Sequence, residues 1–279
     1  MKNSTAYSLV CPHGTLHLNS PVVMGILNVT PDSFYDGGRY SNEESILIRV
    51  EQMIEEGAII IDIGASSTRP GAKAIPVKEE LSRLLPAIRS IRSHFPELFL
   101  SADTFRSEVA MEAVKAGADI INDIAGGDLD AAMFSTVAAL RVPYVLMHMQ
   151  GTPETMQLAP EYTDVTSEIA SRFREKISLL EEAGVRQLIL DPGFGFGKTV
   201  DHNYELLKNL SDFLSFGYPL MAGLSRKAMI NKVLGTRPDT SLNGTTAANT
   251  IALMKGVSVL RVHDVREAAE AIKIVSKCI

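Results

Sequence analysis

The chain has 279 residues, of which 46% are hydrophobic and 22% are charged, a composition that is ordinary for a soluble globular protein. Its formal net charge of −6 comes from interspersed acidic and basic residues without a basic tail, which argues against a nucleic-acid or membrane partner. The two cysteines lie near opposite ends, and neither an apolar amino-terminal segment nor a run of roughly 18 apolar residues is present. We therefore expect a soluble protein of the reducing cytoplasm.

The first expected element is a hairpin from about Ala6 to Leu18, which we expect to cover one end of the domain that follows. Eight short apolar runs come after it. Their Ile, Val and Leu content without polar alternation is typical of parallel strands that are buried on both faces. The runs are Val22–Leu27, Ala58–Ile63, Leu98–Ala102, Asp119–Ile121, Tyr144–Met147, Leu188–Leu190, Pro219–Ala222 and Val257–Val262.

Segments with helical spacing of apolar residues separate these runs. One begins with a capping-box pattern at Ser41 and stops at Gly57, and others begin near Leu81 and Val165. Eight strands that alternate with helices predict a single domain over residues 1–279, a closed (β/α)8 barrel of the TIM type. An open doubly wound sheet is the alternative.

A polar residue ends or follows each apolar run. In a parallel barrel the active site lies at the carboxyl ends of the strands, so these residues predict a polar pocket at that end. They are Asn28, Asp62, Asp103, Asn122, His148, Asp191, Ser225 and His263.

Two loops, residues 28–39 and 66–72, mix Gly and Pro with polar and aromatic residues. This composition suits loops that cover a substrate, although ordinary connecting turns are an open alternative.

The glycine-rich segment 191–199 is another candidate binding loop. It is not a P-loop, because Pro192 stands where that motif requires glycine, and its glycine spacing also differs from the dinucleotide motif. We interpret the glycines as allowing a flat ligand close to the backbone, with Phe196 as a lid and Asp191 as an anchor.

The last two strands carry candidate cationic groups. Lys227 follows the seventh run and could be a Schiff-base nucleophile, an anion clamp or a surface lysine. Arg261 and His263 alternate with Val262, so their side chains share one face of the strand and could hold the same anion.

Five segments in this order resemble the motifs of the dihydropteroate synthases, and the resemblance extends over about residues 20–265. It implies a homodimeric barrel that joins 6-hydroxymethyl-7,8-dihydropterin diphosphate to 4-aminobenzoate, giving 7,8-dihydropteroate and pyrophosphate. Many members carry an acidic residue where this chain has Ser66. The segments are Asn28-Val29-Thr30-Pro31-Asp32-Ser33-Phe34, Ser67-Thr68-Arg69-Pro70-Gly71-Ala72, Asp191-Pro192-Gly193-Phe194-Gly195-Phe196-Gly197-Lys198, Ser225-Arg226-Lys227 and Arg261-Val262-His263.

The resemblance also implies roles for residues at matching positions. Asn28 would bind Mg²⁺, and the expected catalytic residues are Asp103, Lys227, Arg261 and His263. The residues expected to hold the pterin are Asp103, Asn122, Asp191 and Lys227. Those expected at the diphosphate are Thr68, Arg69, Arg261 and His263. Those expected to line the aminobenzoate site are Phe34, Pro70 and Ser225.

Three alternative functions are open from the sequence. A pterin-binding methyltransferase that acts on methyltetrahydrofolate and a corrinoid protein would share the barrel and the pterin residues. A non-catalytic paralogue would bind pterin without turning it over, and an aldolase would use Lys227 as a Schiff-base nucleophile.

Overall fold

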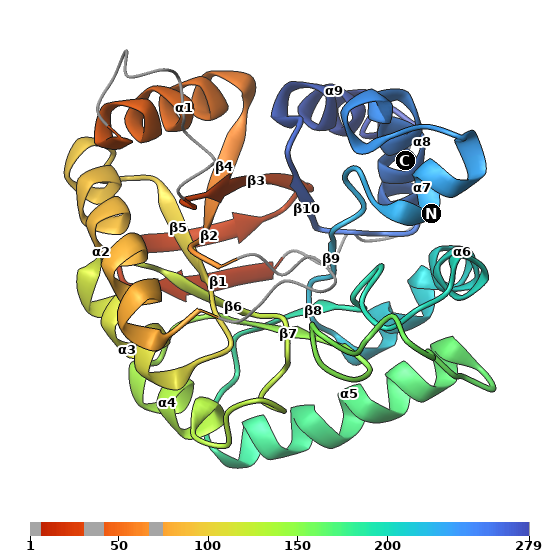
Figure 1. The fold of residues 1–279 in the computed structure, drawn as a ribbon, viewed down its shortest axis with the longest axis horizontal. Coiled ribbons are helices and arrows are strands. Elements are labelled where there is room, and N and C mark those ends of the chain that lie inside the picture. Colours follow the sequence, from red (N-terminus) through yellow and green to blue (C-terminus); the bar gives the residue numbers. More distant parts are fainter. Residues whose placement is uncertain (1–6, 31–41, 67–74, 279) are drawn as a thin grey trace.

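The structure is a computed structural model that describes residues 7–30, 42–66 and 75–278. Parallel strands form a barrel inside a ring of helices (Figure 1). The strands are β3 (Val22–Asn28), β4 (Ala58–Gly64), β5 (Phe99–Asp103), β6 (Ile120–Asp123), β7 (Tyr144–Met147), β8 (Leu188–Asp191), β9 (Met221–Ala222) and β10 (Val259–Val262).

The strands follow the order β8-β7-β6-β5-β4-β3-β10-β9, and neighbouring strands in this sheet pair in parallel. A parallel bridge between Leu190 and Leu220 joins the two ends of the sheet, and the Leu190 N–H donates to the Pro219 carbonyl oxygen at 2.9 Å. The sheet is therefore a nearly closed barrel. The eight predicted strands and the TIM-type fold are confirmed, and the open sheet is excluded.

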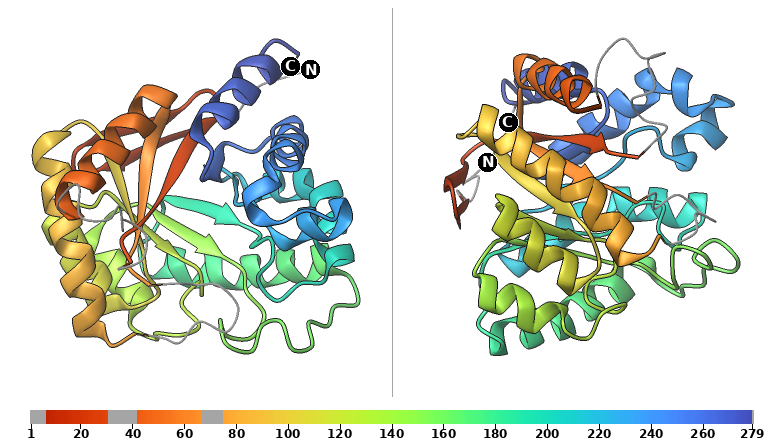
Figure 2. Two further views of the ribbon diagram at one scale, coloured as in Figure 1. Left: turned by 45° about the horizontal axis from the view of Figure 1, so that its top comes forward. Right: turned by 60° about the vertical axis from the view of Figure 1, so that its left-hand side comes forward.

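The helices surround the barrel (Figures 1 and 2), as the alternating sequence pattern predicts. Within the described residues, none of them is both long enough and apolar enough to span a membrane. The α-helices are α1 (Asn42–Glu56), α2 (Val77–His94), α3 (Ser107–Ala116), α4 (Met133–Leu140), α5 (Val165–Glu182), α6 (Val200–Lys208), α7 (Ala228–Leu234), α8 (Leu242–Met254) and α9 (Val265–Val275).

Helix α1 ends at the predicted position. Gly57 follows it with a φ of 109°, a left-handed conformation that glycine adopts without a steric penalty. The predicted capping box begins at Ser41, which lies outside the described residues.

The amino-terminal hairpin is confirmed and lies across one end of the barrel (Figure 2, right). Its strands β1 (Tyr7–Cys11) and β2 (Gly14–Leu18) are antiparallel. Leu9 and Leu16 are buried while Val10 is 62% exposed, so the hairpin presents one apolar face to the barrel.

The inside of the barrel has two layers of different character. The lower layer is apolar and packs against the hairpin; it contains Met24, Ile60, Ile120, Val145, Ile189, Met221 and Val259. Side chains two residues apart on a strand face the same way, so the next inward positions form a second layer above it. That layer contains Asp62, Asn122, Met147, Asp191, Gly223 and Arg261.

Candidate functional site

A narrow cavity opens at the carboxyl ends of the strands, directly above the apolar layer. Its walls come from β6, β7, β8 and β10 and from the segments that follow β6, β8 and β9. The lining residues are Asn122, Ile124, Met147, Asp191, Phe194, Phe196, Gly223, Lys227 and Arg261. The structure therefore brings together residues that are up to 139 positions apart in the chain (261 − 122).

An arginine and two carboxylates form the floor of this site. The Arg261 Nε donates to Asp62 Oδ2 at 2.6 Å, and the Arg261 Nη2 donates to Asp103 Oδ2 at 2.7 Å. Burial acts to lower the pKa of the Arg261 guanidinium, but the carboxylates of Asp62 and Asp103 outweigh it and hold the pKa above its ordinary value. Arg261 is therefore a permanent cation in a buried acidic setting.

Asp62 connects this ion pair to the rest of the cavity wall. Its side chain is fully buried and accepts hydrogen bonds from Ser101 Oγ at 2.5 Å and from Asn122 Nδ2 at 3.0 Å. Because the Asn122 nitrogen faces Asp62, the amide of Asn122 has a defined orientation. The sequence marked Asp62 only as a strand-end residue and assigned it no role. The available signal was a single carboxylate inside the otherwise apolar strand Ala58–Gly64.

The electrostatics of Asp103 and Asp191 favour tight binding of hydrogen-bond donors. Burial raises the pKa of both carboxyl groups, while Arg261 opposes the shift at Asp103. Asp191 Oδ1 accepts a hydrogen bond from the Gly193 N–H at 2.8 Å. This hydrogen bond stabilises the ionised carboxylate and so partly offsets the effect of burial on the pKa of Asp191. In its ionised form each carboxylate can accept further hydrogen bonds.

Lys227 lies at the amino-terminal end of α7, and it is part-buried beside the cavity. Its Nζ is 4.3 Å from the centroid of the Phe196 ring, a cation–π contact. Burial, with Arg261 nearby, lowers the pKa of Lys227 to about 8. The interpretation of Lys227 as a solvated surface lysine is therefore wrong.

Two glycines of the 193–197 loop are needed for close contacts within the protein. A Cβ on Gly193 would lie 2.0 Å from the His148 carbonyl oxygen, and one on Gly197 would lie 2.4 Å from that of Gln150. These glycines let the loop approach the protein backbone after β7. Only Gly195, whose Cβ would lie 3.3 Å from Lys227 Cδ, faces the cavity residues.

His263 and Ser225 form a second pair beside Arg261. Ser225 Oγ and His263 Nδ1 are 3.0 Å apart, and the His263 N–H donates to Ser225 Oγ at 3.2 Å. Burial lowers the pKa of His263 to about 4, so this imidazole is neutral at pH 7. Arg261 and His263 are therefore not two cations side by side: Arg261 is charged and engaged by carboxylates, and His263 is uncharged.

Asn28 ends β3 close to Asp103. A Cβ on Gly64 would lie 3.6 Å from Asp103 Oδ2 and 3.7 Å from Asn28 Oδ1, so the glycine keeps the space between these two oxygens open. Amide and carboxylate oxygens are suitable ligands for Mg²⁺. In the described part of the chain, no group of three or more His, Cys, Asp or Glu residues could hold a metal ion.

Comparisons with known proteins agree on one family. Residues 24–263 match the family described as pterin binding enzyme. The dihydropteroate synthase of Escherichia coli K12 is 48% identical over 267 residues, which cover 94% of this chain and 93% of that one. The chain belongs to the dihydropteroate synthases. Two solved structures are also similar. The Yersinia pestis dihydropteroate synthase with a sulfonamide drug has a TM-score of 0.91 and 42% identity, covering 98% and 99% of the two chains. That of Xanthomonas albilineans in complex with 7,8-dihydropteroate has a TM-score of 0.88 and 40% identity, covering 98% of each.

Four predicted site residues lie outside the described residues, so their positions carry no argument. They are Phe34, Thr68, Arg69 and Pro70. The structure adds three apolar wall residues that the sequence did not single out, because nothing in their local pattern separates them from core residues. They are Ile124, Met147 and Phe194.

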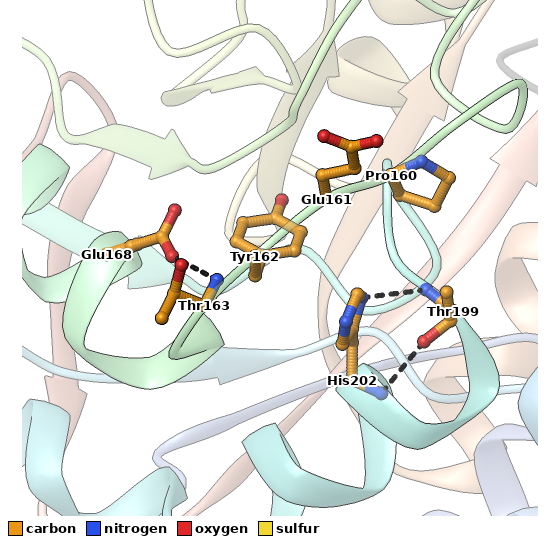
Figure 3. Close-up of a pocket in the computed structure, with 7 residues that line it drawn as sticks. All are labelled: Pro160, Glu161, Tyr162, Thr163, Glu168, Thr199 and His202. Carbon is orange, nitrogen blue, oxygen red and sulfur yellow. Dashed lines mark hydrogen bonds between the residues drawn. The ribbon is translucent and has the colours of Figure 1, made fainter.

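A second, shallow hollow lies on the same rim, near the first turns of α5 and α6 (Figure 3). Several of its polar groups bind backbone at the starts of these two helices. Glu168 accepts the Thr163 N–H at 2.7 Å, and Thr199 and His202 form a reciprocal capping box. We therefore interpret this hollow as a consequence of helix capping.

Proposed function

We propose that this chain condenses 6-hydroxymethyl-7,8-dihydropterin diphosphate with 4-aminobenzoate to give 7,8-dihydropteroate and pyrophosphate. The observation that carries the proposal is one narrow cavity in which Asn122, Asp191, Lys227 and Arg261 meet. The related Xanthomonas albilineans enzyme has been solved with 4-aminobenzoic acid and with 7,8-dihydropteroate, which supports these substrates for this chain.

The cavity suits the edge of a pterin. Such a ring presents N–H groups that can donate to carboxylates. Asp191 lines the cavity, and Asp103 lies next to it as an ion-pair partner of the cavity residue Arg261. Asn122 can both donate and accept, and Lys227 can donate to the acceptor atoms of the ring. Phe196, against which the Lys227 ammonium already rests, adds an apolar surface for the flat heterocycle.

The reaction forms a bond between the amine nitrogen of 4-aminobenzoate and the methylene carbon of the pterin, and it breaks the bond from that carbon to the diphosphate oxygen. The electron pair of the broken bond leaves with pyrophosphate, and the amine loses one proton. The pterin ring can delocalise positive charge on the carbon, so we propose a dissociative displacement. The permanent charge of Arg261, with His263 as a neutral donor, favours the departing anion. A chemical step that depends strictly on amine nucleophilicity would contradict this order of events.

We also propose that Mg²⁺ is bound at Asn28. The amide oxygen of Asn28 and the neighbouring Asp103 carboxylate fit the preference of this ion for oxygen ligands, with the diphosphate and water completing its coordination. When bound, the ion would neutralise charge on the diphosphate.

The central experiment is measurement of pyrophosphate release with both substrates, with each one alone, and with or without Mg²⁺. Release should require both substrates and should be lost when a chelator removes the metal. Lys227→Ala and Arg261→Ala should each lower kcat/KM by about 100-fold or more, because each removes a charge placed against the bound substrate.

Undiminished turnover in both variants would show that the cavity is not the active site. Binding of pterin without any release of pyrophosphate would instead favour the non-catalytic paralogue. The Escherichia coli relative named above is a dihydropteroate synthase, which favours the synthase over the methyltransferase and aldolase alternatives.

We further propose that the chain forms a homodimer in the cytoplasm. Helices α7 and α8 pack together and expose a group of large apolar side chains, which we call the α7–α8 face. Solvent-exposed apolar groups of this kind are typical of protein–protein contacts. Both cysteines are free thiols, which fits a reducing compartment. The α7–α8 face consists of Val233, Leu234, Leu242, Ile251 and Met254.

A further inference from the structure

Lys198 is a buried cation that the substrate chemistry described above does not use. It follows the glycine loop and is only 3% exposed, although lysine is among the residues least often buried. An ammonium group in such a position loses its hydration, so its neighbours must provide all of its hydrogen bonds.

The surroundings of Lys198 match the three donors of an ammonium group. Nζ donates to the Gly193 carbonyl oxygen at 2.9 Å and to the Phe196 carbonyl oxygen at 3.0 Å, and it lies 3.2 Å from His148 Nδ1. A longer contact of 3.4 Å reaches the His148 carbonyl oxygen. Burial lowers the pKa of His148 to about 2, so this imidazole is neutral, and its Nδ1 accepts a hydrogen bond from Lys198 when the ring proton is on Nε2.

These contacts hold the loop on which two cavity groups depend. Phe196 forms a wall of the cavity and supports the Lys227 ammonium. The N–H of Gly193 donates to Asp191 Oδ1 at 2.8 Å and so orients that carboxylate. Lys198 therefore binds the backbone at Gly193, whose N–H orients Asp191, and at Phe196, whose ring lines the cavity.

The loop has no regular secondary structure and is held by side chains from several neighbouring segments. On its outer side, Gln157 Nε2 donates to the Gly195 carbonyl oxygen. Gly193, Gly195 and Gly197 all have positive φ angles, so regular secondary structure cannot fix the backbone. From the side of α6, Asn203 Oδ1 accepts the Gly195 N–H at 2.7 Å. The inner side of the loop is held by Lys198.

We propose that Lys198 is a positioning residue for the pterin half of the site, acting through Asp191 and Phe196 without touching the substrate. This inference rests on the proposed function. It assigns to Lys198 a selective effect on pterin binding, because 4-aminobenzoate is expected to be held by other residues of the rim.

The first test compares Lys198→Met, which keeps the length of the side chain and removes its donors, with the parent enzyme. The KM for the pterin diphosphate should rise about tenfold or more, while the KM for 4-aminobenzoate should stay within about twofold. Isothermal titration with 7,8-dihydropteroate should show the same loss of affinity. Lys198→Gln, which keeps one donor, should give an intermediate loss and serves as the readout if the Met variant does not fold.

Lys176→Met is the matched control. Lys176 also caps a strand-end loop, donating to the Gly126 carbonyl oxygen at 2.9 Å and to Asp128 at 2.6 Å, but neither residue lines the cavity. Its two KM values should stay within about twofold of the parent values. Equal losses in Lys176→Met and Lys198→Met would show a general effect of removing a loop-capping lysine and would overturn the proposal.

The dependence of product affinity on pH distinguishes a role of the Lys198 charge from a purely structural role, which would not change with pH. Burial lowers the pKa of Lys198 to about 7, Asp191 acts to raise it and Lys227 to lower it. Protonated Lys198 makes all three hydrogen bonds. The affinity of the parent enzyme for 7,8-dihydropteroate, divided by that of Lys198→Met, should therefore be largest below pH 7 and should decline as the pH rises. Lys227 and Asp103 titrate in the same pH range and remain in both proteins, so the ratio cancels the part of their contributions that does not depend on the charge of Lys198. A ratio that does not change with pH would contradict the role of the Lys198 charge.

The result separates this inference from the proposed function. If the parent enzyme releases no pyrophosphate, the proposed function fails, while the titration still reports whether Lys198 affects pterin affinity. If the parent is active and Lys198→Met binds 7,8-dihydropteroate with parental affinity, only the inference about Lys198 fails.

Discussion

At the scale of single residues, the site depends on charges that have been removed from water. Asp62 has no exposed surface, and three donors surround its carboxylate. Two of these donors, Asn122 and Arg261, line the cavity. Asp62 therefore holds the groups that we expect to contact the substrate, and the chain keeps a buried carboxylate where an apolar side chain would be easier to accommodate.

We expect Asp62→Asn to impair both stability and pterin binding. The amide that replaces the carboxylate has the same shape, but it carries no charge to pair with Arg261. Its N–H₂ group would also face donors that now bind the carboxylate, such as Asn122 Nδ2. Breaking a buried pair in this way costs about 3 to 5 kcal/mol. Denaturant unfolding should show the lower stability, and the KM for the pterin diphosphate should rise.

Asp128→Asn is the control for this substitution. The side chain of Asp128 is 63% exposed, and its ion pair with Lys176 lies at the surface. Such a pair contributes about 1 kcal/mol or less. A comparable loss of stability in both variants would mean that the buried position of Asp62 has no special importance.

At the scale of elements, the two ends of the barrel have different roles: the hairpin closes one end, and the carboxyl ends of the strands form the site at the other. The hairpin covers the lower apolar layer, and Asp119 fastens it there by accepting hydrogen bonds from the backbone and the ring of His13. Arg92 from α2 binds the same carboxylate at 2.5 Å. The hairpin is therefore a closing element of the barrel that is remote from the chemistry.

We expect Leu16→Ala to lower stability and leave catalysis unchanged. Leu16 is 1% exposed and points into the lower layer, so its truncation removes apolar contacts and leaves a cavity, which costs about 2 to 5 kcal/mol. Thermal or denaturant unfolding measures the loss, and both KM values should match those of the parent below the unfolding transition.

Val10→Ala on the same hairpin should change stability by about 0.5 kcal/mol or less, because Val10 is 62% exposed. Altered substrate affinity in Leu16→Ala would show that the two ends of the barrel are coupled, against this division of work.

At the scale of the whole molecule, exposed apolar side chains are unevenly distributed around the barrel. The α7–α8 face gathers partly exposed apolar side chains, among them Val233 at 60% and Met254 at 53% exposure. Helix α3 lies on the opposite side of the strand ring, next to β5, and exposes Met111 at 40%. An association surface on the α7–α8 face would leave the mouth of the cavity, at the strand ends, free for substrates.

We expect the combined change Val233→Lys and Met254→Lys to convert a dimer to monomers. Placing two like charges on each copy of a shared apolar surface opposes its burial. Sedimentation equilibrium measures the result, and Met111→Lys should remain dimeric. A parent chain that sediments as a monomer at micromolar concentration would refute the homodimer itself, and a dimeric double variant would place its contact elsewhere.

The sequence by itself determined the order of the elements, because eight apolar runs and the helical spacing between them reflect short-range physics of burial and periodicity. It also indicated which strand ends carry polar groups. The orientation of those groups depends on partners far along the chain, such as Asp62 with Arg261 at a separation of 199 residues. For this reason only the tertiary structure decided that Lys227 is part-buried, that His263 is neutral, that Gly193 and Gly197 pack against protein backbone, and that Lys198 supports the loop. Each of these properties depends on desolvation and close approach, and these exist only once the barrel has closed.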